Sequence, residues 1–244
     1  MFSSSDVFLC LGRRKSGKSH LARKLSHAYP RKVIFDTLGE YSDRDGLLCS
    51  SFEEFSKNLI ATERDSEFTL IYQFDIEKDQ NVVEFNEALR CLFYRGNLLI
   101  LVEEIQNFSS PHSMCLWLKN SLLIGRHRNL ALLFTTQRPG ECHKTIVSQA
   151  NHVFCGSLHE KNDLEYVRTV LGDHAYRLIN IPERQFLYFQ PGKSLQHIDN
   201  DLNLLKAERP PSLATPMETP SPDAPESDST PENESDSVNT LNQT

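Results

Sequence analysis

One stretch near the N-terminus has the residue types and the spacing of a phosphate-binding loop, G-x-x-x-x-G-K-[ST]. Its two glycines allow backbone N–H groups to turn inward toward phosphate oxygens. Lys18 would place a positive charge against the β- and γ-phosphates, and the Ser19 hydroxyl can ligate Mg²⁺. The sequence therefore predicts that this chain binds a nucleoside triphosphate. The residues expected at the phosphates are Gly12, Arg13, Arg14, Lys15, Ser16, Gly17, Lys18 and Ser19.

A pair of adjacent carboxylates follows a second apolar run. Residues 98–102 are all apolar, which indicates a buried strand, and Glu103 and Glu104 come directly after it. In phosphoryl-transfer sites one such acid holds the Mg²⁺ shell, and the second orients and deprotonates the attacking water. Two solvated glutamates that open a loop would give the same pattern, but the phosphate-binding loop favours the functional interpretation. We therefore expect Glu103 and Ser19 at the metal and Glu104 as the catalytic base.

A third apolar run, residues 130–134, leads into a polar segment, Thr135 to Pro139. An amide at the end of a core strand can contact both the γ-phosphate and the attacking water, so Gln137 is a candidate catalytic residue. Arg126 lies just before this run. It could be an ordinary surface arginine, a DNA contact, or a finger that reaches the nucleotide of a neighbouring subunit; such a finger can be worth about 10³–10⁵ in rate.

The elements that must position these residues alternate between short apolar strands and amphipathic helices. Continuous apolar strands are typical of a parallel sheet that is buried on both faces. The pattern predicts an α/β fold, a three-layer sandwich whose ligands bind at the carboxyl ends of the strands. The expected strands are Val7–Leu11, Lys32–Phe35, Phe68–Gln73, Leu98–Val102, Leu130–Thr135, His152–Cys155 and Gln185–Phe189. The expected helices are Ser19–Ala28, Phe52–Ala61, Asn81–Tyr94, Ser113–Ile124 and Asp163–Leu171.

Composition divides the 244 residues into one α/β domain, residues 1–207, and a tail, residues 208–244. From Pro210 onward the chain has seven of its twelve prolines, seven acidic residues and no Lys or Arg, which predicts disorder. The net charge of −7 belongs to this tail, because residues 1–209 contain 26 acidic and 26 basic residues.

Six scattered cysteines without a C-x-x-C pair indicate reduced thiols, and no apolar run is long enough to span a membrane. We expect a protein of the cytoplasm, or of the host cytoplasm or virion if it is viral.

Four motifs, in this order, resemble the HerA/FtsK superfamily of P-loop motors. They are the loop at 12–19, the segment F-D-T-L-G-E-Y at 35–41, the acidic strand end at 103–104, and T-Q-R-P at 136–139. The resemblance implies a RecA/ASCE-like P-loop ATPase that uses ATP and Mg²⁺ and forms a homo-oligomeric ring, usually a hexamer, that moves double-stranded DNA. It also places the arginine finger of the family on Arg126. The short chain is most similar to the genome-packaging ATPases of icosahedral viruses with internal membranes, and its tail would then face a capsid or membrane partner.

One position departs from the family pattern. The family usually has Asp followed by Glu at the acidic strand end, whereas this chain has Glu103 followed by Glu104. A longer side chain can still reach the Mg²⁺ water shell, so the role is retained. The alternatives are another HerA-like DNA motor, a P-loop small-molecule kinase, and a nucleotide-gated assembly protein with little turnover.

Overall fold

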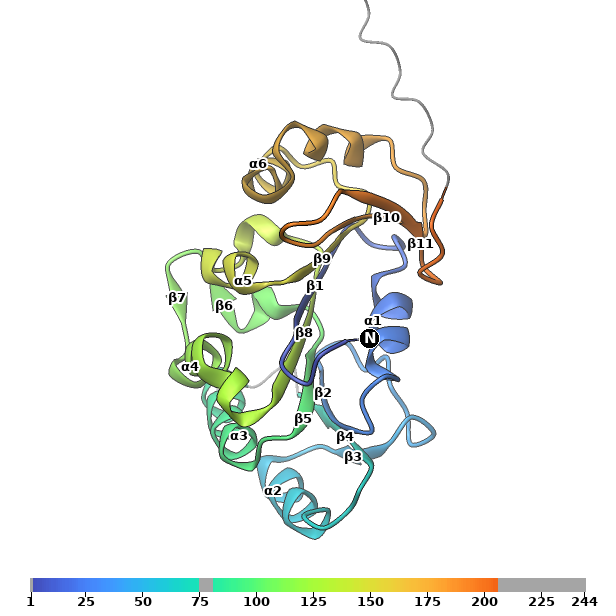
Figure 1. Ribbon diagram of the computed structural model, residues 1–244. Coiled ribbons are helices and arrows are strands. Elements are labelled where there is room, and N and C mark those ends of the chain that lie inside the picture. The colour runs from blue at the N-terminus through green and yellow to red at the C-terminus, as the bar shows by residue number, and fades with distance from the viewer. Residues whose placement is uncertain (1, 75–80, 206–244) are drawn as a thin grey trace, which may run out of the picture. The chain divides into compact units, whose positions relative to one another are not determined.

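A nine-stranded sheet forms the centre of residues 2–74 and 81–205, which are the residues that the computed structural model describes (Figure 1). Seven strands are parallel, and the last two in the chain are antiparallel to their neighbours. This is the mainly parallel sheet that the sequence predicts. Across the sheet the strands are β11 (Gln196–Asp199), β10 (Gln185–Phe189), β9 (His152–Cys155), β1 (Val7–Leu11), β8 (Leu130–Thr136), β5 (Leu98–Val102), β2 (Arg31–Asp36), β4 (Phe68–Gln73) and β3 (Leu47–Cys49).

Helices cover both faces of the sheet, because successive side chains of each buried strand point to opposite sides. In β1, Phe8 and Cys10 join the core under α1 (Lys18–Ser26), whereas Leu9 and Leu11 join the core on the other side. Figure 1 shows α1 on one face and the remaining helices on the opposite face. The result is the predicted three-layer α/β sandwich. The helices of the second face are α2 (Phe52–Ala61), α3 (Asn81–Arg95), α4 (Leu116–Ile124), α5 (Lys144–Gln149) and α6 (Lys161–Leu171).

The strand order determines which strand ends meet. β8 lies between β1 and β5, with Leu11 beside Thr136 and Val102 beside Phe134. All three strands are parallel, so their carboxyl ends reach the same edge of the sheet. The phosphate-binding loop, the Glu103–Glu104 pair and Gln137 therefore come together there, although more than 120 residues separate the first from the last.

Local signals explain where several helices begin and end. The Ser51 side chain accepts a hydrogen bond from the Glu54 N–H (3.2 Å), which caps α2. α3 ends before Gly96, whose φ of 63° is in the left-handed region that glycine adopts most easily. A Cβ at Gly96 would lie 2.5 Å from the carbonyl oxygen of Arg128, so this close approach also requires glycine.

The structure corrects several expected boundaries. The helix expected from Ser113 begins at Leu116, because Ser113–Met114 forms β7 and pairs with β6 (Ser109–Ser110) in a separate hairpin. The helix expected at Ser19–Ala28 spans Lys18–Ser26, with Gly17 as its N-cap. β3, α5 and β11 are additional elements. Short 3₁₀ helices lie at η1 (Ile105–Asn107), η2 (Gly125–Arg128), η3 (Pro139–Glu141) and η4 (Gly172–Ile179).

Two expectations concern the ends and surroundings of the chain. The predicted tail, residues 208–244, lies outside the described residues, so the domain boundary at 207 stays a prediction. Within the described part of the chain, no helix combines the length and the apolar character that crossing a membrane requires.

Candidate nucleotide site

The loop between β1 and α1 has the backbone of an anion site. Gly12 and Gly17 adopt φ values of 149° and 96°, which residues with a Cβ rarely adopt. A Cβ at Gly12 would also lie only 2.7 Å from the Ser16 Oγ. Among the described residues, no acceptor is present for the N–H groups of Gly17, the N-cap of α1, and of Lys18 and Ser19, its first two residues. Free N–H groups at a helix N-terminus, with the positive end of the helix dipole, form a site for phosphate.

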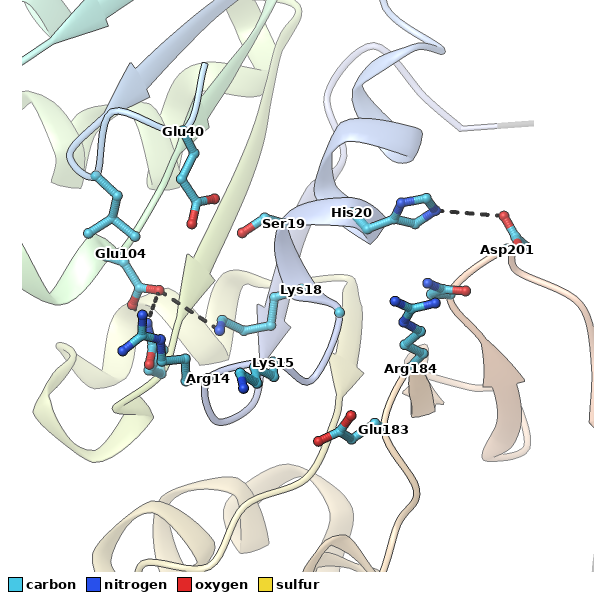
Figure 2. Close-up of a pocket in the computed structure, with 14 residues that line it drawn as sticks. Arg14, Lys15, Lys18, Ser19, His20, Glu40, Glu104, Glu183, Arg184 and Asp201 are labelled. Atoms are coloured by element: carbon cyan, nitrogen blue, oxygen red, sulfur yellow. Dashed lines mark hydrogen bonds and ion pairs between the residues drawn. The ribbon is translucent and has the colours of Figure 1, made fainter. Parts of the chain in front are cut away.

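The three basic residues of the loop are exposed, in contrast to the lysine that follows. Arg14 and Lys15 line a cavity of about 690 Å³, and the Arg13 guanidinium lies 4.0 Å from the Glu183 carboxylate. The cavity opens directly over the loop, and Figure 2 shows its lining side chains. The other residues that line the cavity are Gly17, Lys18, Ser19, His20, Leu38, Glu40, Glu104, Gln137, Glu183, Arg184, Asn200 and Asp201.

Lys18 and Glu104 face each other at the floor of this cavity. The Lys18 Nζ lies 3.9 Å from the Glu104 Oε1, and each side chain is only 5% exposed. Burial lowers the pKa of Lys18, and the negative charge of Glu104 acts in the opposite direction. The Nζ also donates to the Arg13 carbonyl oxygen (3.4 Å). Both contacts are long and an ammonium has three hydrogens to donate, so Lys18 retains the capacity to bind a phosphate oxygen.

Glu104 is held by amide groups from two further elements. Gln137 donates to it twice, from its side-chain Nε2 to Oε1 (2.8 Å) and from its backbone N–H to Oε2 (3.0 Å). Gln106 Nε2 also donates to Oε2 (2.7 Å), and the Gln106 Oε1 accepts from the Thr136 hydroxyl (2.7 Å). These donors fix the carboxylate beside the phosphate-binding loop, where it could accept a proton from a water. Gln106 is a site residue that the motifs did not indicate.

Glu103 lies below the cavity and does not line it. Its side chain accepts hydrogen bonds from the hydroxyls of Tyr41 (2.9 Å, to Oε1) and Thr135 (to Oε2). The residue is 1% exposed, and burial raises the pKa of its carboxyl group. The structure therefore brings Ser19, Glu104 and Gln137 to the cavity but keeps Glu103 beneath it. The metal role expected for Glu103 stays a prediction.

The residues present fit a Mg²⁺ ion that is held jointly with a nucleotide. Hydroxyl and carboxylate oxygens from Ser19, Glu40 and Glu104 face the cavity (Figure 2). In the described ranges, no group of three or more His, Cys, Asp and Glu side chains could hold a metal by itself. Mg²⁺ typically takes only one or two carboxylates and completes its shell with water and substrate phosphates, so this donor set is sufficient.

Arg126 lies at the opposite edge of the sheet. It belongs to η2, which precedes the amino end of β8, whereas the phosphate-binding loop follows the carboxyl end of β1. The seven residues of β8 separate the two edges by roughly 20 Å. Arg126 is exposed, and its Nε lies 3.4 Å from the His127 Nε2. The arginine therefore does not reach the cavity of its own chain.

The far end of the cavity is built by residues that flank the β10–β11 hairpin; the sequence predicted β10 but neither β11 nor their antiparallel pairing. Arg184, which has a φ of 61°, donates its N–H to the Ser16 carbonyl (3.1 Å). Asn200 in turn donates its N–H to the Arg184 carbonyl (2.9 Å). Asp201 pairs with Lys24 (2.7 Å). No motif marks these residues, because only the antiparallel pairing of β10 and β11 brings them to the loop.

Comparison with known proteins gives a likeness of fold. No family model matches this sequence, and no curated protein matches it significantly. The genome packaging NTPase B204 from Sulfolobus turreted icosahedral virus 2, in complex with ATPγS, superimposes with a TM-score of 0.66 at 19% identity. The match covers 80% of this chain and 98% of that chain. B204 from Sulfolobus turreted icosahedral virus, described as a DNA-packaging ATPase, gives a TM-score of 0.60 at 16% identity, covering 80% and 98%. The chain therefore has the fold of these P-loop packaging ATPases, which confirms at the level of the fold the resemblance that the motifs indicated.

Proposed function

We propose that this protein hydrolyses ATP in a homo-oligomeric ring and uses the energy to move double-stranded DNA, most specifically to package a viral genome. The observation that carries the proposal is the convergence of Lys18, Glu104 and Gln137 on one cavity above a loop with free N–H groups. A surface turn between a strand and a helix would have no reason to bury a lysine and a glutamate together.

The chain's own residues account for binding and for proton transfer. The loop at 12–19 would bind the phosphates through its N–H groups and through Lys18. Bound Mg²⁺ would neutralise charge that develops on the phosphate oxygens. A γ-phosphate near Lys18 would compete with Glu104 for the ammonium and for the Gln137 amide. Glu104 would then be free to orient a water and accept its proton, while Gln106 keeps the carboxylate in place.

The position of Arg126 supports the ring. An exposed arginine at the edge opposite the cavity could complete only the site of another subunit, as the family resemblance implies. We therefore propose a ring, with six subunits as the expected number, in which Arg126 contacts the nucleotide of its neighbour. The B204 proteins are named as genome or DNA packaging enzymes, which supports DNA as the partner of this chain. Packaging would occur in the host cytoplasm or at the virion, with a capsid or membrane protein bound by residues 208–244.

The test is the rate of ATP hydrolysis with and without double-stranded DNA, in the wild type and in Glu104→Gln. We expect DNA to stimulate the wild type, and the variant to lose about 10²–10⁴ in turnover while still binding ATP, because it lacks the general base. Glu165→Gln is the matched control, since Glu165 lies on the exposed face of α6 and pairs with Arg168.

Other outcomes would favour the alternative functions. DNA-independent transfer of phosphate to a nucleoside or nucleotide would indicate a kinase. ATP binding with negligible turnover in the assembled protein would indicate a nucleotide-gated assembly protein. Either result would contradict the motor.

A further inference from the structure

The loop after β2, residues 37–41, is attached to the sheet by one buried carboxylate. Asp36 is fully buried at its base. Its Oδ1 accepts the N–H groups of Leu38 (3.2 Å) and Glu40 (3.1 Å), and its Oδ2 accepts the N–H of Tyr41 (3.1 Å). The Gln73 amide also donates to Oδ2 (3.0 Å). A single carboxylate thus fixes the backbone of the whole loop.

The last two residues of this loop point to different places. Tyr41 points inward, is 5% exposed and donates its hydroxyl to Glu103. Glu40 points into the nucleotide cavity, and Figure 2 shows its carboxylate directed toward the space between Ser19 and Glu104. The Arg23 guanidinium lies 4.0 Å from the centre of the Tyr41 ring and donates to the Glu40 carbonyl oxygen, which braces the pair from outside.

The Glu40 carboxylate has no hydrogen bond or ion pair within the described residues, whereas both oxygens of Glu103 are occupied. Glu40 is nonetheless close enough to the phosphate-binding loop for its charge to act on Lys18. An unpaired carboxylate beside a triphosphate would repel it, unless a cation lay between the two. Mg²⁺ bridges carboxylate and phosphate oxygens in this way.

We propose that Glu40 is the carboxylate that completes the Mg²⁺ site together with Ser19, and that Glu103 is a positioning residue that holds the Glu40 loop through Tyr41. This inference rests on the proposed binding of ATP with Mg²⁺. It separates two roles that the motifs assign to one residue. It also explains how a glutamate can occupy the position where the family usually has an aspartate, because Glu103 does not need to reach the metal.

The test measures the affinity for a non-hydrolysable ATP analogue by calorimetry, once with Mg²⁺ and once with EDTA. In the wild type we expect Mg²⁺ to tighten binding. In Glu40→Gln this gain should shrink about tenfold, which is the effect of losing one charged ligand. Binding in EDTA should be unchanged or tighter, because a repulsive charge is removed. Glu40 is exposed, so the substitution leaves the core intact.

Two further variants make the result specific. Asp43→Asn removes an exposed acid three residues away that does not line the cavity, and should behave as the wild type. Glu103→Gln should reduce the Mg²⁺ gain less than Glu40→Gln does. With Mn²⁺ in place of Mg²⁺, electron paramagnetic resonance should detect weaker binding of the metal–nucleotide complex by Glu40→Gln.

An unchanged Mg²⁺ gain in Glu40→Gln, or a larger loss in Glu103→Gln, would overturn this inference and leave the proposed ATPase function intact. A wild type that binds no ATP analogue under either condition would overturn both.

Discussion

The amino ends and the carboxyl ends of the parallel strands form two opposite sides of the central sheet, here called the amino edge and the carboxyl edge. Both carry polar residues, but the two edges differ in how completely these residues are paired. At the amino edge, Asp6 accepts from the Asn151 amide (2.9 Å) and lies 3.2 Å from the His152 Nε2. The other ring nitrogen of His152 lies 2.7 Å from the Tyr188 hydroxyl. Each group finds its partner inside this cluster. At the carboxyl edge, Lys18 donates one long hydrogen bond to the Arg13 carbonyl oxygen (3.4 Å) and lies 3.9 Å from the Glu104 carboxylate. The exposed Glu40 carboxylate has no side-chain partner among the described residues.

This difference separates a structural cluster from a functional one. Buried polar groups are ordinarily satisfied, because an unsatisfied one costs about 1–3 kcal/mol. The amino edge follows that rule. At the carboxyl edge, the buried Lys18 ammonium makes only long contacts, and the N–H groups of Gly17, Lys18 and Ser19 have no acceptor among the described residues. The Glu40 carboxylate beside them is exposed and unpaired. A Mg²⁺–nucleotide complex has the charges that would satisfy all of them.

Arg126 is the exception to this division, because it lies at the amino edge but is exposed and is proposed to act in catalysis. If it completes the site of a neighbouring subunit, Arg126→Ala should reduce turnover of the ring by about 10³–10⁵. ATP binding by each subunit should remain. Mixing Arg126→Ala with Glu104→Gln should restore part of the activity, since some interfaces then combine an intact base with an intact arginine.

Arg64→Ala is the matched control, because Arg64 is exposed near the end of α2 and lies far from η2 in the sequence. Mixed rings that recover no activity would contradict the arginine finger and would indicate that Arg126 is an ordinary surface residue.

Removal of the buried cation at the carboxyl edge should produce the next largest effect. Lys18→Ala should weaken ATP binding roughly 10- to 100-fold, the loss expected for a hydrogen-bonded charge of about 1.5–3 kcal/mol. Lys57→Ala, at an exposed position of α2, should bind as the wild type does. Equilibrium titration with a fluorescent ATP analogue measures both. Equal affinity in the two variants would show that the buried position of Lys18 has no role in binding.

The amino edge should reveal itself through stability and not through activity. Burial lowers the pKa of His152 below its ordinary value of 6.5, with Asp6 opposing the shift. The unfolded chain therefore binds a proton at a higher pH than the folded protein does, so the free energy of unfolding falls as the pH drops below about 6.5. The loss cannot exceed about 1.4 kcal/mol per pH unit for one group.

Chemical denaturation at pH 5.5 and pH 8 measures this effect. His152→Gln cannot titrate, so the difference in stability between the two pH values should be smaller than in the wild type. Turnover per folded protein should be unchanged. An identical pH dependence of stability in both proteins would show that His152 does not cause it.

Much of the fold was predictable because the responsible residues are adjacent in the chain. The strand at Val7–Leu11, the glycines at 12 and 17 and the cap at Ser51 act over a few positions, and their types reveal their conformations. β3 is an outermost strand of the sheet and has only three residues, so its hydrophobic pattern is too short to recognise. In β11 only Ile198 is buried, and its hydrophobic pattern is correspondingly weak.

The α/β class, the phosphate-binding loop and the strands whose ends carry Glu104 and Gln137 could all be predicted from the order of residues in the chain. The position of β8 between β1 and β5, which brings Gln137 into contact with Glu104, is apparent only in the folded protein. The folded protein also shows that adjacent residues point in different directions. Glu103 is buried beneath Tyr41 while Glu104 faces Lys18, and Tyr41 points inward while Glu40 faces the cavity. Glu104 has a φ of 52°, in the left-handed region, and the Glu40 and Tyr41 N–H groups are held by the Asp36 carboxylate. The member of each pair that faces the cavity is therefore set by these turns, which contacts between distant segments stabilise and which no local pattern reveals.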